Sequence, residues 1–173
     1  YVYLKCPNRI LGAFLFSSGL LSVIIFHADL YTGKACQLKC LKSPLYLIKV
    51  LFENIVGTGR FAGMTFHDKK AVSIAQKILE VKFSKSFLDF LIDGIICGIC
   101  IAIAVKGYKR AESSYVGIAI VIMAVAVFII TGSEHVVADM YYICAANCKL
   151  TDCWFIIPVL IGNTIGGIIM CLV

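Results

Sequence analysis

Long apolar runs alternate with short polar stretches along almost the whole chain. The apolar runs cover residues 10–30, 44–64, 86–105, 115–143 and 154–173, and a membrane-spanning helix needs about 20 such residues. The run at 44–64 is the weakest, because it contains Lys49, Glu53, Asn54 and Arg60. Between the second and third runs, 70–82 is predicted to be a short helix outside the hydrocarbon. The pattern predicts an all-α integral membrane protein with about five spans.

Two of these runs contain polar stretches that interrupt the helical pattern. The run at 115–143 is too long for one straight span and is polar at 131–135, so we predict two half-helices joined by a break. A second polar stretch, 28–33, ends the first run. It fits either another break, which membranes tolerate where the backbone is buried or lines a cavity, or an edge turn of Asp and Thr beside a glycine.

Composition supports the membrane interpretation. Hydrophobic residues make up 61% of the 173 residues and charged residues only 15%, against about 45–50% and about 25% in soluble domains. These values exclude an ordinary soluble enzyme and a disordered chain. The net charge is +6. Basic residues cluster in short connections between the apolar runs, at 34–42, 65–85 and 106–110, which is typical of topology signals. We therefore expect a lipid bilayer as the partner and no nucleic acid.

Cysteine is frequent, with nine residues, but several lie inside apolar runs, where cysteine behaves as a small hydrophobe. Cys97 and Cys100 have the spacing of a redox pair. No thioredoxin-like pattern surrounds them, so small packing residues are the favoured interpretation and a redox enzyme the last alternative. We expect no disulfide scaffold and no cofactor.

The strongest chemical candidates are Glu134 and His135, with Asp139 four residues later, all in an apolar segment. Ionisable side chains at membrane depth are costly and usually face a pathway or a partner, and histidine titrates near neutral pH. The pattern favours proton handling over a histidine that only packs. His135 and Asp139 also have metal-ligand spacing, but no further ligand pair does, so we expect no metal.

Three other positions stand out. Lys82 lies at the mouth of the third apolar run, where it either snorkels or attracts anions. The segments NIVG (54–57) and GNTIG (162–166) recur in the second and last runs. Such recurrence together with broken helices is typical of transporter folds that bind substrate at the membrane midplane.

Taken together, these segments resemble the formate/nitrite transporter family. Residues 132–141 (GSEHVVADMY) resemble the motif GFEHSxANM[FY] of the family's broken fifth helix, and 28–33 (ADLYTG) resemble the motif A[DE]LFT[GS] of its broken second helix. Residues 82–87, 162–167 and 54–57 resemble motifs of the fourth, sixth and third helices. The chain departs from the pattern in having Asp139 for an asparagine, and Gly98 stands where many members have asparagine.

The resemblance implies an aquaporin-like helical bundle with two broken helices and a pore within each protomer of a homopentamer. It implies a channel or transporter for small monovalent anions such as formate, nitrite, lactate, acetate or hydrosulfide, with proton coupling through a central histidine, in a plasma membrane. Residues 1–173 would form one transmembrane domain equivalent to the family's second to sixth helices, and the first helix would be missing.

The family mechanism assigns a role to each matching residue. A bare anion does not cross an apolar constriction cheaply, so His135 would donate a hydrogen bond or a proton, with Thr32 orienting it. Lys82 would concentrate anions, and Glu134 would support the broken loop. The remaining expectations are constrictions at Phe128, Leu30 and Tyr31, backbone hydrogen bonds from Asn54 and Asn163, and an Asp139 that keeps a proton or pairs with His135.

Two alternatives remain open at this point. One is an aquaporin-like channel for neutral solutes, in which His135 is structural; the absence of an Asn-Pro-Ala box in the sequence argues against a true aquaporin. The other is a truncated member of the family that does not transport.

Overall fold

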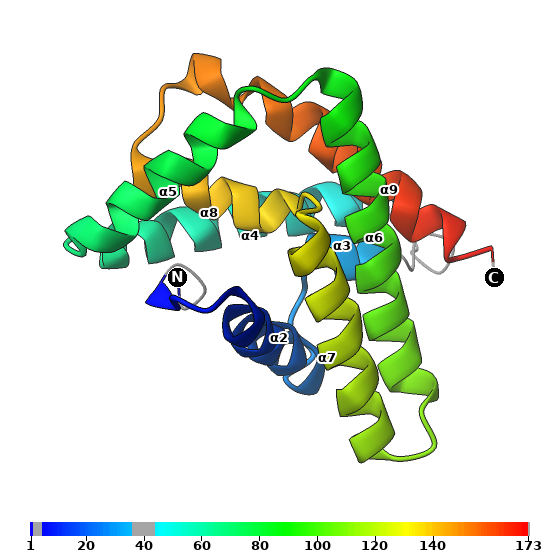
Figure 1. The fold of residues 1–173 in the computed structure, drawn as a ribbon. Coiled ribbons are helices and arrows are strands. Elements are labelled where there is room, and N and C mark those ends of the chain that lie inside the picture. Colours follow the sequence, from blue (N-terminus) through cyan, green and yellow to red (C-terminus); the bar gives the residue numbers. More distant parts are fainter. Residues whose placement is uncertain (2–4, 36–43, 173) are drawn as a thin grey trace.

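The computed structural model describes residues 1, 5–35 and 44–172, and the regular structure of these residues is entirely helical (Figure 1). The long apolar runs and the predicted helix at 70–82 all form helices. The elements in chain order are α2 (Arg9–Ile25), α3 (Tyr31–Ala35), α4 (Pro44–Thr65), α5 (Lys69–Lys82), α6 (Phe87–Arg110), α7 (Ser114–Thr131), α8 (Val136–Ala146), the 3₁₀ helix η2 (Leu150–Phe155) and α9 (Ile156–Ile169).

Both polar stretches interrupt a helix. The run at 115–143 forms two helices as predicted, α7 and α8, which meet at an angle in Figure 1. Gly132 ends α7 with φ at 75°, a left-handed conformation that glycine adopts without steric cost. The first run is broken in the same way, because α2 ends at Ile25 and α3 begins at Tyr31.

Helices α6 and α9 pack closely through glycines. A Cβ added to Gly98 would lie 2.4 Å from the carbonyl oxygen of Asn163, and one added to Gly166 would lie 2.2 Å from that of Ile95. Backbone atoms cannot move aside without moving a whole helix. Glycine is therefore what allows this spacing, as at other helix interfaces in membranes.

The described helices form two apolar cores. One joins α4, α5 and α8 with the start of α6 and with η2, through residues that include Val50, Leu79, Phe90, Val136 and Phe155. The other joins α2, α6 and α7 through Ala13, Cys97, Ile101, Val125 and Phe128. Cys97 and Cys100 are buried in this second core as free thiols on α6.

Among the described residues, three helical segments are long and apolar enough to cross a membrane: Phe87–Arg110, Ser114–Thr131 and Thr151–Ile169. Ile10–Ile25 and Val136–Ala146 are apolar but shorter, as expected for the arms of broken helices. The predicted basic loop at 34–42 lies almost wholly outside the described residues.

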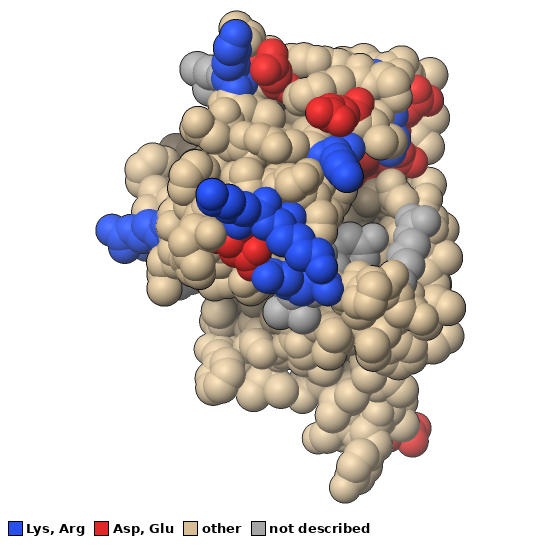
Figure 2. Space-filling model, turned by 60° about the vertical axis from the view of Figure 1, so that its left-hand side comes forward, with Lys and Arg blue, Asp and Glu red and all other residues tan. Residues whose placement is uncertain are grey.

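The surface of the molecule is largely apolar. Large apolar side chains such as Phe52, Met123 and Ile157 are exposed, which is typical of a lipid-facing surface. Figure 2 shows the charged side chains of one face gathered in a few groups, with uncharged surface around them. One of these groups holds several basic side chains close together, beside an acidic one.

Candidate functional site

The two helix breaks meet where Thr32 contacts His135. Thr32 lies in α3 just after the first break, and His135 is the last residue before α8. Thr32 Oγ1 and His135 Nε2 are 3.0 Å apart, and both side chains are buried. This contact joins segments that are far apart in the sequence.

The hydrogen bonds of His135 assign its tautomer. His135 is the N-cap of α8, and its Nδ1 accepts the backbone N–H of Ala138 at 3.1 Å. A nitrogen that accepts this bond carries no hydrogen, so the hydrogen lies on Nε2 and is donated to Thr32 Oγ1. A second proton, on Nδ1, would face the Ala138 N–H and break the helix cap. In this geometry His135 is a neutral hydrogen-bond donor.

Asn54 holds the first break together. Its Oδ1 accepts the backbone N–H of Tyr31 at 2.8 Å, and its Nδ2 donates to the carbonyl oxygen of Asp29 at 2.9 Å. The side chain thus bridges the backbone on the two sides of Leu30. These groups have no partner within a regular helix, because the helix is interrupted here.

Asn163 holds the second break in the same way. Its Oδ1 accepts the N–H of Val136 at 2.9 Å, and its Nδ2 donates to the carbonyl of Glu134 at 2.8 Å, so it bridges across His135. The same Nδ2 also donates to the carbonyl of Gly94 in α6 at 2.8 Å. Asn163 is completely buried.

An acidic residue precedes the bridged residue in each break and pairs with lysine. Asp29 pairs with Lys34 at 2.8 Å. Glu134 pairs through Oε1 with Lys85 at 2.7 Å and through Oε2 with Lys82. The two breaks therefore share the same order of groups: an ion-paired acid, the bridged residue and the start of the next helix.

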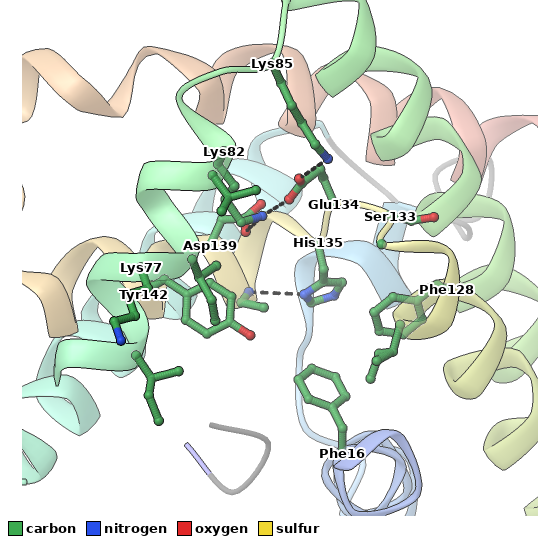
Figure 3. Close-up of a pocket in the computed structure, with 16 residues that line it drawn as sticks. Phe16, Lys77, Lys82, Lys85, Phe128, Ser133, Glu134, His135, Asp139 and Tyr142 are labelled. Atoms are coloured by element: carbon green, nitrogen blue, oxygen red, sulfur yellow. Dashed lines mark hydrogen bonds and ion pairs between the residues drawn. The ribbon is translucent and has the colours of Figure 1, made fainter. Parts of the chain in front are cut away.

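The second break continues into a longer series of ion pairs, which we call the charge chain: Asp93, Lys85, Glu134, Lys82 and Asp139. Figure 3 shows the last four of these side chains. Lys85 joins Asp93 to Glu134, with Nζ–O distances of 2.7 Å to each. Lys82 joins Glu134 to Asp139, whose Oδ1 lies 2.9 Å from Nζ. Side-chain exposure falls from 26% at Asp93 to 1% at Asp139.

Asp139 bonds to Lys82 rather than to the ring of His135. Pairing with His135 was one of the two roles expected for it, and this structure does not have that pair; the residues are joined only through the Asp139 N–H and the His135 carbonyl, at 2.9 Å. The other carboxylate oxygen, Oδ2, is buried without a hydrogen-bond partner among the described residues. Its place in the first turn of α8 favours a negative charge by about 2 kcal/mol at most.

Three cavities lined by described residues follow one another past His135. The first, of about 490 Å³, is lined by Lys77 and by the second break. It shares His135 and Phe16 with a second cavity of about 380 Å³. Leu30 lines both the second cavity and a third of about 80 Å³, which Lys34 also lines. Basic side chains thus lie at both ends of the series.

Aromatic rings narrow the space beside His135. The Phe128 ring lies almost parallel to the imidazole, with centroids 6.0 Å apart, and Phe16 of α2 meets Phe128 edge-on at 5.8 Å. Tyr31, expected at the opposite constriction, is directed towards α9, with its hydroxyl 2.8 Å from Thr164 Oγ1.

Helix α5 brings Lys77 and Lys82 to the first cavity. Asp68 is its N-cap and accepts the N–H of Ala71 at 3.1 Å. The neighbouring Lys5 ammonium and the Tyr1 hydroxyl, together with this weaker cap bond, hold the pKa of Asp68 well below its usual value. The charge of Asp68 therefore helps to position the helix that lines the cavity.

Sequence reasoning did not single out Lys85, Asp93 or Phe16 as site residues. Asp93 carried a usable signal, because a carboxylate inside an apolar run needs a partner. Lys85 follows the end of α5 and gives no such signal. Nothing in the sequence distinguishes Phe16 from the other apolar residues of α2.

Comparison with known proteins gives consistent matches. A family model described as Formate/nitrite transporter matches residues 3–173. The chain is 31% identical to an uncharacterized transporter, YrhG, of Bacillus subtilis (strain 168), over 92% of this chain and 68% of that protein. It is 32% identical to the formate channel BtFdhC of Bacillus thuringiensis, over 92% of this chain and 69% of that one. A solved pentameric formate channel with formate bound has a similar fold, with a TM-score of 0.79, 22% identity and coverage of 95% of this chain and 80% of that one.

Proposed function

The chain belongs to the formate/nitrite transporter family, and we propose that it carries small monovalent anions across a membrane together with a proton. Formate, nitrite, lactate, acetate and hydrosulfide form the candidate substrate class. The observation that carries the proposal is the series of three cavities that passes His135 and has lysines at both ends. The names of the Bacillus thuringiensis relative and of the solved structure support formate as the first substrate to test.

In this proposal, electrostatic attraction brings the anion to the first cavity. Lys82 and Lys85 each contact two carboxylates, so they hold the second break and contribute mainly through the summed field of the site. Lys77 is exposed, and none of the described residues that line this cavity forms an ion pair with it. It is therefore the cation best placed to meet an incoming anion, because a positive charge at a cleft raises the local anion concentration.

The central step is the loss of water at His135. Transfer of a bare anion past the apolar rings of Phe128 and Phe16 is too costly, so the anion crosses as the neutral acid. His135 Nε2–H, now bonded to Thr32, turns to the substrate oxygen and replaces part of its hydration. Leu30 forms the next narrow point, between the second and third cavities.

We further propose that residues 1–173 form one transmembrane domain of a homopentamer in a plasma membrane. The exposed apolar faces of α4, α7 and α9 leave ample surface for lipid and for neighbouring protomers. The formate channel with a similar fold is pentameric, which supports the same assembly. Native mass spectrometry of the purified chain in detergent tests it: five copies are expected, and a monomer would contradict it.

Transport is tested with the purified chain in liposomes that contain a pH-sensitive dye. Adding formate outside should acidify the interior, and His135→Ala should lose most of this signal. His67→Gln is the matched control, because His67 is an exposed histidine between α4 and α5. Water permeability in the same liposomes, without acidification, would instead indicate a neutral-solute channel; neither signal from folded protein would indicate a non-transporting member.

A further inference from the structure

The charge chain does not balance if all five side chains are ionised. Three carboxylates and two ammonium groups leave one excess negative charge in a largely buried site. An unpaired buried charge is unfavourable, and buried acids commonly neutralise by taking up a proton. Hydrogen bonds and exposure together show which carboxylate is least stabilised as an anion.

Asp139 is the under-coordinated acid. Glu134 is bonded through both oxygens, one to each lysine. Asp93 shares Lys85 and is 26% exposed, so water can solvate it. Asp139 is 1% exposed, bonds only through Oδ1, and has a buried Oδ2 without a donor among the described residues.

We infer that Asp139 binds a proton on Oδ2 and that this proton makes the charge chain electrically neutral beside His135. The inference rests on the proposed function only for its effect on transport. Bulk protons reach the site through the first cavity, which Asp139 helps to line. His135 does not replace Asp139 as the proton-binding group, because its Nδ1 is committed to the cap of α8.

The titratable and charged groups around Asp139 come from several parts of the fold. Helix α5 and the residues after it supply Lys82 and Lys85. The second break supplies Glu134 and His135. Helix α6 supplies the Asp93 carboxylate and the buried thiol of Cys97, which lies close enough to interact electrostatically with Asp139. Helix α8 itself supplies a tyrosine ring beneath one of the lysine ammonium groups. These groups are Lys82, Lys85, Glu134, His135, Asp93, Cys97 and Tyr142.

The sign of the pH effect follows from this arrangement. With Asp139 protonated, the charge chain is neutral and does not repel an anion in the first cavity. When Asp139 loses its proton at higher pH, the excess negative charge returns next to His135. Anion flux therefore falls with rising pH by more than the loss of protonated substrate alone explains.

Infrared spectroscopy of the reconstituted full chain tests for the proton without any transport assay. The wild type should show, at neutral pH, the carbonyl stretch of a protonated carboxylic acid that shifts in D₂O. Asp139→Asn should remove this band, and Glu112→Gln, which changes an exposed acid between α6 and α7 that lies outside the charge chain, should keep it. If the wild type lacks the band, or if Asp139→Asn retains it, the inference is overturned. The wild-type spectrum decides even if the variant does not fold.

A flux measurement then tests the consequence. The formate flux of Asp139→Asn should depend less steeply on alkaline pH than that of the wild type, while the flux of Glu112→Gln should follow the wild type. Identical pH profiles for all three proteins would overturn the role of Asp139 in transport. If Asp139 is protonated but the wild-type chain shows no flux at all, the proton site is confirmed and the proposed transport function is overturned.

Discussion

Asn54 and Asn163 occupy equivalent places, each bridging the backbone across a single residue of a helix break, and Asn163 makes one more hydrogen bond than Asn54. That bond goes to the carbonyl of Gly94 in α6. Asn163 therefore ties the second break to a spanning helix, whereas Asn54 ties the first break to its own helix, α4.

Replacing Asn163 by alanine should destabilise the protein more than replacing Asn54. The first change strands three backbone groups and the second strands two, and a hydrogen bond inside a membrane protein contributes about 0.6 kcal/mol on average. We expect a loss of about 2 kcal/mol for Asn163→Ala and about 1 kcal/mol for Asn54→Ala. Thermal unfolding in detergent measures both, and the reverse order would contradict this account of the breaks.

Gly166→Ala should force α6 and α9 apart. The added Cβ would lie 2.2 Å from the carbonyl oxygen of Ile95, and overpacking of this kind typically costs about 1–3 kcal/mol. Gly63→Ala is the control, because a Cβ there meets nothing within 4 Å. The unfolding midpoint should drop for Gly166→Ala alone; an equal stability of the two variants would show that the interface adapts.

Lys77→Gln should weaken capture of the anion without changing the central step. We expect the KM for formate to rise about two- to fivefold at low ionic strength, as for other exposed charge interactions, with little change in maximal flux. The effect should disappear in high salt. Lys70→Gln on the same helix serves as control, and an equal effect of both substitutions would show that Lys77 has no special place.

The pKa of Asp68 predicts how acid affects α5. The pKa of Asp68 is lower in the folded state than in the unfolded state, where it is about 3.9. At a pH above about 3.9, the charged Asp68 therefore stabilises the start of α5. This stabilisation is lost as the pH falls towards the pKa of the folded state. Hydrogen exchange should show α5 losing protection with acid in the wild type. Asp68→Asn should show lower protection at neutral pH and a weaker dependence on acid. The same acid dependence in both proteins would rule out Asp68 as its source.

The hydrophobic pattern predicted the helices well, because the length of an apolar run and its interruption by Gly132 are local properties. It also predicted the break at 131–135, but it left the stretch at 28–33 open between a break and an edge turn. The roles of Asn54 and Asn163 at the breaks were expected from the family resemblance. The structure adds that Asn54 and Asn163 bridge the two breaks in the same way. This likeness depends on how α4 and α9 pack against the breaks, which the pattern along the chain does not contain.

Side-chain direction and pairing were the features that the pattern could not supply. Tyr31 was expected at a constriction, but its hydroxyl finds Thr164 on α9. Lys85 and Asp93 lie eight residues apart and pair directly, and they belong to the site because Lys85 also pairs with Glu134. Such partners are set by tertiary packing, and no spacing rule along the chain reveals them.

The central claim is that an anion passes His135 as an electrically neutral acid. It is tested most directly by uptake of labelled formate into liposomes in which a pH gradient and a membrane voltage are imposed separately. We predict uptake that follows the pH gradient, ignores the voltage, and is strongly reduced in His135→Ala and in Thr32→Val. Uptake that follows the voltage, or that is unchanged in His135→Ala, would contradict the claim.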